Sequence, residues 1–233
     1  MKEKSEVESF LAEHGWLSFT APEFRAGVFS RIQQRDFDKG EFVYRAGDVG
    51  GGIWAIVEGA IEIESATPGA GPHLMHFGVP GMWFGEGPLI FGAPRVVSVK
   101  TPRASTLVTL SLADCQALLT ADPAAWRWIA MLSAMTTELA AGVIADLLLR
   151  DPVKRTAALL LRLSGVRSTV FRSTRPAPIY LSQEKLAQLV NLSRNSIIPV
   201  LKDFVRSGHI EISYGSIRVL DIAGLTNTIA REA

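Results

Sequence analysis

Cysteine and histidine are scarce in this sequence, which limits the chemistry it can support. Only one cysteine, Cys115, and four histidines occur among its 233 residues. One cysteine permits no internal disulfide and no four-cysteine zinc or iron–sulfur site. No serine–histidine–acid spacing, metal-ligand cluster or phosphate-binding glycine loop stands out. We therefore expect no catalytic activity and no bound metal.

A long uninterrupted hydrophobic run is also missing. The most apolar stretch, residues 128–149, is broken by Glu138 and Asp146, which is typical of a buried or paired helix rather than a membrane span. The N-terminal M-K-E-K-S-E-V-E-S-F is charged and lacks the apolar segment of a secretory signal. We expect a cytoplasmic protein without membrane contact.

Net charge is small over the whole chain, but the two parts differ in sign. The formal net charge is +1, with 48% hydrophobic and 20% charged residues, as in a soluble globular protein. Residues 1–150 contain 12 Lys and Arg against 17 Asp and Glu, a net of −5, whereas residues 151–233 contain 12 against 6, a net of +6. Such a basic C-terminal third is typical of a module that contacts polyanions.

Short alternating apolar runs fill residues 37–110, among them I-W-A-I-V, I-E-I-E and L-V-T-L. Turn signals such as T-P-G-A-G-P separate them. This alternation predicts an all-β sandwich or barrel. Residues 7–29 predict one or two short helices before it, and S-L-A-D-C-Q-A-L-L-T begins a helical region after it.

Residues 124–150 predict one long helix. Its apolar stripe has a three-four spacing close to a coiled-coil seam, through Ile129, Leu132, Thr136, Leu139 and Val143. Such a helix favours pairing with its copy in a dimer, with packing on its own β domain alone as the alternative. Asp151-Pro152 ends it, because the residue before proline is pushed out of the α region. We predict a β domain over 1–123, a dimerisation helix over 124–150 and a C-terminal domain over 151–233.

Two capped helices with a tight turn are predicted near the C-terminus. Ser182 can cap a helix that begins at Gln183 and buries Leu186, Ala187, Leu189 and Val190. Asn191 accepts the left-handed conformation that a sharp turn requires. Ser193 can cap a second helix, whose buried face would be Ile197, Val200, Leu201, Phe204 and Val205. This is the pattern of a helix-turn-helix.

After Gly208, the segment I-E-I-S-Y-G-S-I-R-V-L alternates around Tyr214-Gly215 and predicts a β-hairpin wing. The second helix would present outward Arg194, Asn195, Ile198, Lys202 and Arg206. Arginine can bond guanine, asparagine can bond adenine, and a lysine further along suits a phosphate. A winged helix used only for protein contacts is the alternative.

Pro199 lies inside the second predicted helix. It cannot donate to the carbonyl of Asn195, at a cost of up to about 3 kcal/mol in a helix interior. We expect a bend or a tight first turn that leaves the helix-turn-helix in place.

The chain resembles the Crp/Fnr family of bacterial transcription regulators over nearly its whole length. The most specific stretches are G-M-W-F-G-E-G-P-L-I-F-G-A-P-R-V-V and L-S-R-N-S-I-I-P-V-L-K. The resemblance implies an α+β fold with an N-terminal β-roll of the cyclic-nucleotide-binding, jelly-roll kind, a long dimerisation helix and a C-terminal winged helix-turn-helix. It also implies a homodimer on a two-fold symmetric site of double-stranded DNA, with RNA polymerase as a further candidate partner.

In that family the helix after the turn enters the major groove. The resemblance therefore implies base-reading positions for Arg194 and Asn195, and we assign Ser182, Gln183, Ser193, Ile198 and Lys202 to the same DNA-binding surface. Pro199 stands where many members have an arginine, so that base contact is missing here.

The resemblance also implies an effector site. Gly85, Glu86 and Arg95 match the loop and short helix that hold a cyclic nucleotide, where the glutamate binds the ribose hydroxyl and the arginine pairs with the phosphate. Cyclic-AMP binders have Ser or Thr at Val96, and Thr and Ser at Ala140 and Ala141. These differences remove polar contacts of roughly 0.5–1.5 kcal/mol each, which argues against cyclic AMP as the effector. A mutual Glu86–Arg95 ion pair in an empty or repurposed site, or another ligand, remains open.

Other sensor chemistries have weaker support. His73 and His76 lie in a region resembling that of the haem ligand in some relatives, but surface histidines are the better interpretation. Cys115 lies on a predicted apolar helix face and is expected to be inert. We expect a sequence-specific DNA-binding transcription regulator, controlled through its β-roll by an effector other than cyclic AMP. The alternative is a nucleotide-sensing regulatory protein whose winged helix docks on protein.

Overall fold

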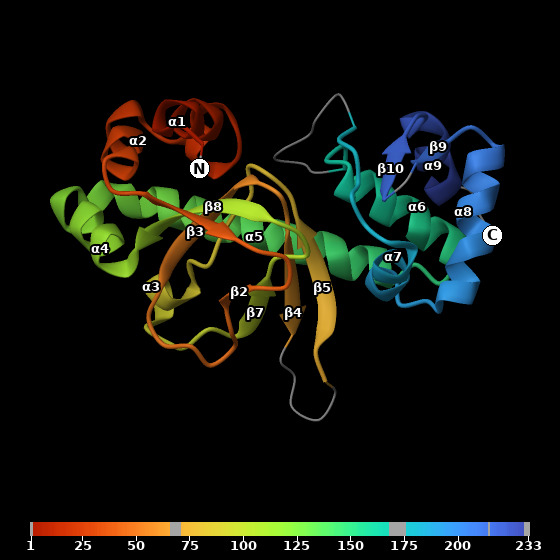
Figure 1. Cartoon of the computed structure of the whole chain (residues 1–233), viewed down its shortest axis with the longest axis horizontal. Coiled ribbons are helices and arrows are strands. Elements are labelled where there is room, and N and C mark those ends of the chain that lie inside the picture. Colours follow the sequence, from red (N-terminus) through yellow and green to blue (C-terminus); the bar gives the residue numbers. More distant parts are fainter. Residues whose placement is uncertain (1, 66–70, 168–175, 214, 231–233) are drawn as a thin grey trace. The chain divides into compact units, whose positions relative to one another are not determined.

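A computed structural model of the chain describes residues 2–65, 71–167, 176–213 and 215–230 (Figure 1). The chain forms two compact units, residues 1–137 and 138–233. The boundary falls inside helix α5 (Trp126–Leu147), so this helix contributes residues to both units. The predicted division into three segments stays a prediction.

Short helices begin the N-terminal unit, as predicted: α1 (Lys4–Glu13), the 3₁₀ turn η1 (Trp16–Phe19) and α2 (Pro22–Phe29). Their apolar side chains, including Leu11, Trp16 and Val28, are buried against the β structure. The helices therefore form a layer that covers one sheet.

Two four-stranded antiparallel sheets form the β-roll, with strand orders β1-β8-β3-β6 and β2-β7-β4-β5. The first contains β1 (Gln33–Phe37), β8 (Ser105–Ser111), β3 (Gly52–Glu58) and β6 (Trp83–Phe84). The second contains β2 (Phe42–Tyr44), β7 (Val97–Lys100), β4 (Ile61–Ser65) and β5 (His73–Gly78). The predicted all-β region is confirmed, although most of T-P-G-A-G-P lies outside the described residues.

Strand β3 contributes to two separate cores because successive side chains of a strand point to opposite faces. Ile53, Ala55 and Val57 pack with the N-terminal helices. Trp54 and Ile56 pack in the second core with residues of the other sheet. The continuous apolar run I-W-A-I-V is thus explained by a strand that is covered on both faces.

The β-roll is completed by α3 (Gly87–Phe91), α4 (Leu112–Ala121) and the 3₁₀ turn η2 (Pro123–Ala125). Ser111 caps α4 by accepting a hydrogen bond from the backbone N–H of Asp114 at 3.1 Å. Cys115 on α4 is buried, and burial raises the pKa of its thiol to about 11. This agrees with the expectation of an inert cysteine.

Helix α5 ends at Leu147, three residues before the predicted end. Asp151 is extended and caps the next helix by accepting from the N–H of Val153 at 2.7 Å, so the chain leaves the helical conformation before Pro152. By length and composition alone, the segment Pro123–Leu147 could cross a membrane. In the structure, Ile129 and Leu132 of this segment are buried in the first core.

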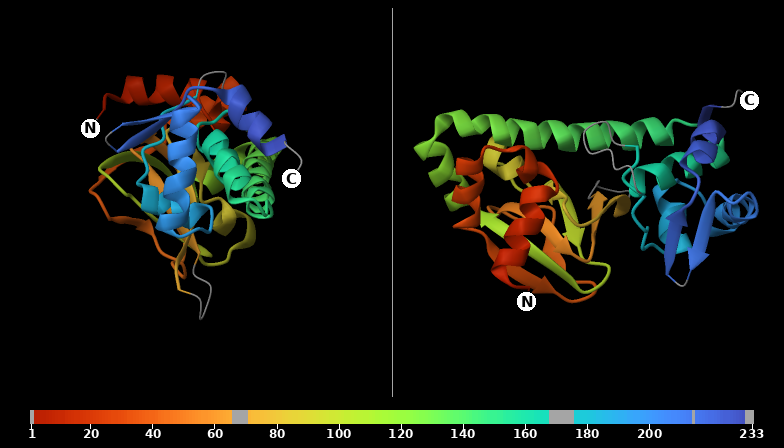
Figure 2. Two further views of the ribbon diagram at one scale, coloured as in Figure 1. Left: turned by 90° about the vertical axis from the view of Figure 1, so that its right-hand side faces the viewer. Right: turned by 90° about the horizontal axis from the view of Figure 1, so that it is seen from above.

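The C-terminal unit contains α6 (Pro152–Leu163), α7 (Gln183–Leu189), α8 (Arg194–Arg206), β9 (Ile210–Ser213), β10 (Ser216–Val219) and α9 (Ile222–Ala230). Helix α6 packs against α8 and α9, and α7 against α8. Figure 2 shows α8 beside the β9–β10 hairpin. Much of the polar segment 164–178 lies outside the described residues, as does Tyr214. The predicted architecture of β-roll, long helix and winged helix-turn-helix is confirmed.

Candidate DNA-binding surface and effector site

The first helix of the helix-turn-helix begins at its predicted cap. The Ser182 hydroxyl oxygen accepts a hydrogen bond from the backbone N–H of Lys185 at 3.2 Å. The inner side chains of α7 are buried as predicted: Leu186, Ala187, Leu189 and the following Val190. Helix α7 is therefore held against the core of the unit, and the half-buried Gln183 is its first residue.

Asn191 makes the turn between the two helices. Its φ of 51° is the only positive φ of a non-glycine residue in the part of the chain that the structure describes. Its N–H donates to the carbonyl of Gln188 at 3.1 Å, and the N–H of Leu192 donates to Ala187 at 2.9 Å. This pair of bonds is the Schellman arrangement, in which a left-handed residue ends a helix. The predicted role of Asn191 is confirmed.

The second helix begins at Ser193, whose hydroxyl oxygen accepts from the N–H of Ser196 at 3.1 Å. Its buried side chains are Ile197, Val200, Leu201 and Phe204. The prediction of a buried Val205 is wrong, because this side chain is 43% exposed. At 3.6 residues per turn, Val205 lies about 90° from the centre of the buried stripe and so falls at its edge.

The predicted polar side chains of α8 lie outside its buried stripe. Arg194, Asn195, Lys202 and Arg206 are exposed, and Ile198 is half-buried. The Arg206 guanidinium contacts Asp203 at 3.2 Å, and both of these side chains are largely in solvent. The helix thus presents cations and an amide on one side and only apolar side chains to the core.

Helix α8 continues through Pro199 without a break from Arg194 to Arg206. The expectation that the helix-turn-helix persists despite this proline is confirmed, whereas the bend stays a prediction. Pro199 is exposed, so its missing N–H removes one hydrogen bond on the solvent side of the helix.

The wing is the antiparallel pair β9 and β10, with Ser213 opposite Ser216 and Ile212 opposite Ile217. Its base is held by Asp221, which accepts from the N–H of Gly224 at 2.8 Å and contacts His209 Nδ1 at 3.1 Å. The bond from Gly224, followed by that from His209, lowers the pKa of Asp221. The wing is therefore fixed next to the end of α8.

In the N-terminal unit, Arg95 is the centre of the candidate effector site. It is 5% exposed, and its guanidinium donates through Nη1 to the carbonyl of Gly85 at 2.5 Å and through Nη2 to that of Gly52 at 2.7 Å. The guanidinium carbon lies 4.2 Å from the centre of the Tyr44 ring. Burial lowers the pKa of Arg95, while the charges of neighbouring groups oppose this.

Two glycines make room for this arginine. A Cβ on Gly51 would lie 2.3 Å from Arg95 Nη2, and a Cβ on Gly85 would lie 2.8 Å from Nη1. Both glycines have a positive φ, 105° and 92°, which side chains rarely adopt. The backbone therefore wraps closely around the guanidinium, and sequence reasoning missed the role of Gly51 and Gly52.

Glu86 is 7% exposed, at the start of α3. Among the described residues no hydrogen bond or close ion pair joins its carboxylate to Arg95, although the charge of Glu86 raises the pKa of Arg95. A buried carboxylate that makes no hydrogen bond is a ready acceptor for a hydroxyl or amine donor.

The other assigned effector residues lie at exposed positions. Val96 is 82% exposed beside Arg95. Ala140 and Ala141 are exposed on the part of α5 that belongs to the C-terminal unit. None of the three offers a side-chain hydrogen bond.

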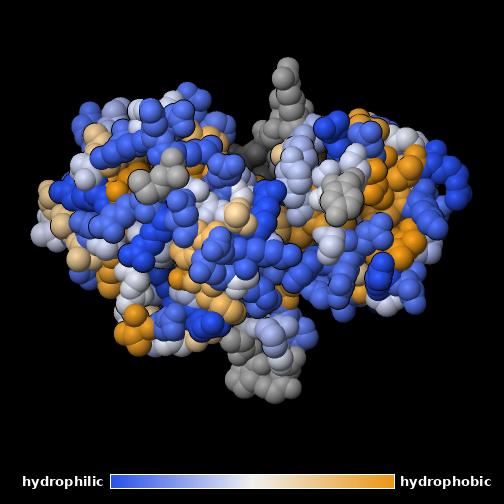
Figure 3. Space-filling view, in the orientation of Figure 1, coloured by the Kyte–Doolittle hydropathy of each residue, from blue (hydrophilic) through white to orange (hydrophobic). Residues whose placement is uncertain are grey.

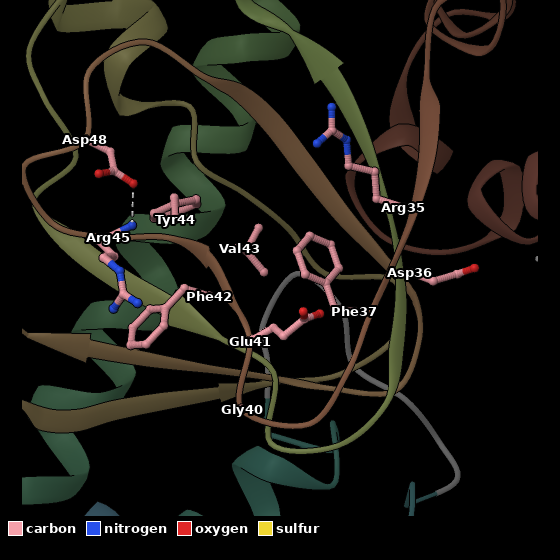
Figure 4. A pocket seen from close by; sticks show the side chains of 10 residues that line it. All are labelled: Arg35, Asp36, Phe37, Gly40, Glu41, Phe42, Val43, Tyr44, Arg45 and Asp48. Carbon is pink, nitrogen blue, oxygen red and sulfur yellow. Dashed lines mark hydrogen bonds between the residues drawn. The ribbon is translucent and has the colours of Figure 1, made fainter.

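An open depression of about 670 Å³ lies over β1 and β2 and shares Tyr44 with the surroundings of Arg95, and sequence reasoning did not predict it (Figure 4). In it, Arg45 stacks on the Phe42 ring, with its guanidinium carbon 3.4 Å from the ring centre. Asp48 accepts from the N–H of Arg45 at 2.7 Å, as the dashed line in Figure 4 shows.

The described residues contain no group of three or more His, Cys, Asp or Glu side chains that could hold a metal ion.

Both units match known families. A family model described as the cyclic nucleotide-binding domain matches residues 34–122, and one described as the Crp-like helix-turn-helix domain matches residues 154–228. The solved structure of FixK2 from Bradyrhizobium japonicum has a TM-score of 0.73 at 15% identity, covering 87% of this chain and 99% of that one. This structural likeness concerns the fold.

Curated relatives give the family. The CRP-like cAMP-activated global transcriptional regulator of Mycobacterium tuberculosis (strain CDC 1551 / Oshkosh) is 25% identical over 227 residues, which are 97% of this chain and 100% of that protein. The HTH-type transcriptional regulator Cmr of the same strain is 30% identical over 200 residues, 83% of this chain and 75% of that protein. The chain therefore belongs to the Crp/Fnr family of transcription regulators, with an effector-binding domain followed by a DNA-binding helix-turn-helix.

Proposed function

We propose that the protein is a homodimeric regulator that binds a two-fold symmetric DNA site through α8 and the wing, under the control of an effector other than cyclic AMP. The main support for DNA binding is the amphipathic character of helix α8. Its inner stripe is buried, whereas Asn195, Lys202 and Arg206 are exposed. Residues 151–233 have a net charge of +6, which favours a polyanionic partner.

The side chains divide into base-reading and phosphate-binding groups. Arg194 and Asn195, in the first turn of α8, suit hydrogen bonds to base edges. Lys202 suits a phosphate, as do Ser182 and Ser193. The oxygens of both serine hydroxyls accept cap bonds. The Ser182 O–H is left to donate to a phosphate oxygen, whereas the Ser193 hydroxyl also bonds the Ser196 hydroxyl at 2.8 Å. Gln183 and Ile198 complete the proposed surface.

The proposed dimer pairs the long helices. The C-terminal part of α5 exposes Ile144 at 59% and Leu147 at 40%. Burying such side chains against a second copy removes apolar surface from water. A two-fold dimer would place its recognition helices in successive major grooves, roughly 34 Å apart. RNA polymerase is a further proposed partner, and the cytoplasm the proposed location.

The proposed effector site lies around Glu86 and Arg95, with Gly85 as an acceptor for the arginine. The relative from M. tuberculosis is cAMP-activated by name. In this chain Val96, Ala140 and Ala141 have no hydroxyl to bond the phosphate or the adenine. The Arg95 guanidinium already donates to two carbonyls, so a ligand has only its remaining N–H groups to bond.

Signal transfer is proposed as a population shift around the segment between α5 and α6. Asp151 caps α6, and Asp146 on α5 binds Arg162 on α6 at 2.8 Å. The ion pair ties α6 to the end of α5 within the C-terminal unit. An effector that moves α5 would thereby change the spacing of the two recognition helices.

The test is a DNA-binding titration of Arg194→Ala. Fluorescence anisotropy with DNA from the gene's upstream region should show weaker and less selective binding than the unaltered protein. The matched control is Lys39→Ala, which removes an exposed positive charge from the N-terminal unit and should bind normally. Equal binding by both variants would refute the role of α8. A winged helix that docks on protein would instead give little DNA affinity.

A further inference from the structure

We propose that Ile198 and Pro199 form an apolar reading surface on α8 that recognises the 5-methyl group of thymine in the major groove. This inference rests on the proposed DNA-binding function and adds base specificity to it. The proposed surface depends on where Pro199 lies on the helix. At 3.6 residues per turn, Pro199 shares a helix face with Asn195, four residues before, and Lys202, three residues after.

The exposure of these residues supports that placement. Pro199, Asn195 and Lys202 are all exposed, and Ile198 beside them is half-buried. The core stripe of α8 lies on the opposite side. Two apolar side chains therefore interrupt an otherwise polar outward face, between an amide that suits a base and an amine that suits a phosphate.

Hydrophobic side chains also gather over the C-terminal unit near α8 on the face drawn in Figure 3. Val205 and Ile212 are 43% and 38% exposed. Val205 lies at the edge of the buried stripe, whereas Pro199 lies near the middle of the outward face. Pro199 shares the face of Asn195. It is therefore the exposed apolar residue of α8 that would enter the same DNA groove as Asn195.

The chemistry of the groove selects the base. The major-groove edges of adenine and guanine present hydrogen-bonding atoms, and thymine adds a methyl group. An apolar side chain placed on a hydrogen-bonding base edge displaces the water bound to that edge and offers no hydrogen bond in its place. Placed on the thymine methyl, it removes two apolar surfaces from water. The Pro199 ring carries no hydrogen-bonding atom, so the methyl is its best partner.

The experiment uses full-length protein and removes single methyl groups from the DNA. Bound sequences are first selected from a pool of randomised duplexes. In the selected site, each thymine is then replaced in turn by uracil, which differs only in lacking the methyl. One position in each half-site should lose about 4-fold in affinity, the value of one buried methyl-sized group. Cytosine at that position should bind weakly and 5-methylcytosine better.

Three variants identify the residues responsible. Pro199→Ala and Ile198→Ala should bind the thymine and uracil sites more equally, while Val205→Ala should discriminate like the unaltered protein. Pro199→Ala restores a helix donor, so its melting temperature should not fall, and a loss of discrimination cannot come from unfolding. Selected sites that tolerate uracil everywhere, or discrimination that persists in both variants, would overturn the inference and leave the DNA-binding function intact. No enrichment of any duplex would overturn both.

Discussion

Arg162 on α6 donates through Nε to the carboxylate of Asp146 on α5 at 2.8 Å, and Arg167 contacts the other oxygen of the same carboxylate. Asp146 is 3% exposed. Burial lowers the pKa of Arg162, and the hydrogen bond and charge of Asp146 oppose that shift. One buried carboxylate thus compensates the desolvated charge of a buried guanidinium and ties the two helices together.

Asp146→Asn should destabilise the protein by about 3 kcal/mol, because it leaves the buried cation without its counter-charge. Chemical denaturation followed by circular dichroism measures the loss. Asp203→Asn is the matched control, since its partner Arg206 is exposed and the pair contributes about 0.5 kcal/mol or less. Equal stability of the two variants would contradict a structural role for the buried pair.

Asn191→Val should destabilise the helix-turn-helix by about 1–2 kcal/mol, because φ at this position is 51° and a β-branched side chain clashes there. Asn191→Gly should change the free energy of unfolding by much less, since glycine has no Cβ. Thermal unfolding of the two variants decides the matter. A valine variant as stable as the glycine variant would show that the turn relaxes to another conformation.

Cys115 should react slowly with thiol reagents in the folded protein. With a pKa of about 11, about one thiol in a thousand is ionised at pH 8, and the side chain is also buried. Labelling should accelerate on adding denaturant. Because the folded pKa lies above the usual 9.0, the thiol's contribution to stability is full below pH 9 and is lost as pH rises towards about 11. Fast labelling of the native protein at pH 8 would be inconsistent with this burial.

Val96→Ser should strengthen cyclic AMP binding by roughly 2- to 12-fold, because it adds a hydroxyl donor beside Arg95. The side chain is 82% exposed, so the fold should tolerate the change. Isothermal calorimetry measures the affinity, with Val205→Ser as the control for a serine placed far from the site in sequence. If both variants bind cyclic AMP as the unaltered protein does, the missing hydroxyl does not explain the specificity.

Local sequence signals predicted the helix-turn-helix well. Ser182 and Ser193 cap helices within three residues of themselves, and Asn191 turns the chain through its own backbone. Such features depend on neighbours in sequence, so they can be read from a single chain. Val205 was misplaced because it lies at the edge of a helical stripe, where burial depends on which element packs beside it.

The effector site was harder to predict. The resemblance gave Glu86 and Arg95, but the Arg95 partner Gly52 lies 43 residues away in sequence. Only the pairing of distant segments brings that carbonyl to the guanidinium. The same holds for Tyr44, which stacks on Arg95 from strand β2. No periodicity in the sequence reports such contacts.

DNA binding and its response to cyclic AMP are measured together by titrating labelled upstream DNA with the protein at two salt concentrations, with and without cyclic AMP. We predict tight binding that weakens steeply with salt, because phosphate contacts release counterions, and that is unchanged by cyclic AMP. Binding that requires cyclic AMP would contradict the proposed effector specificity. Absence of salt-sensitive binding in every condition would contradict the proposed DNA-binding function itself.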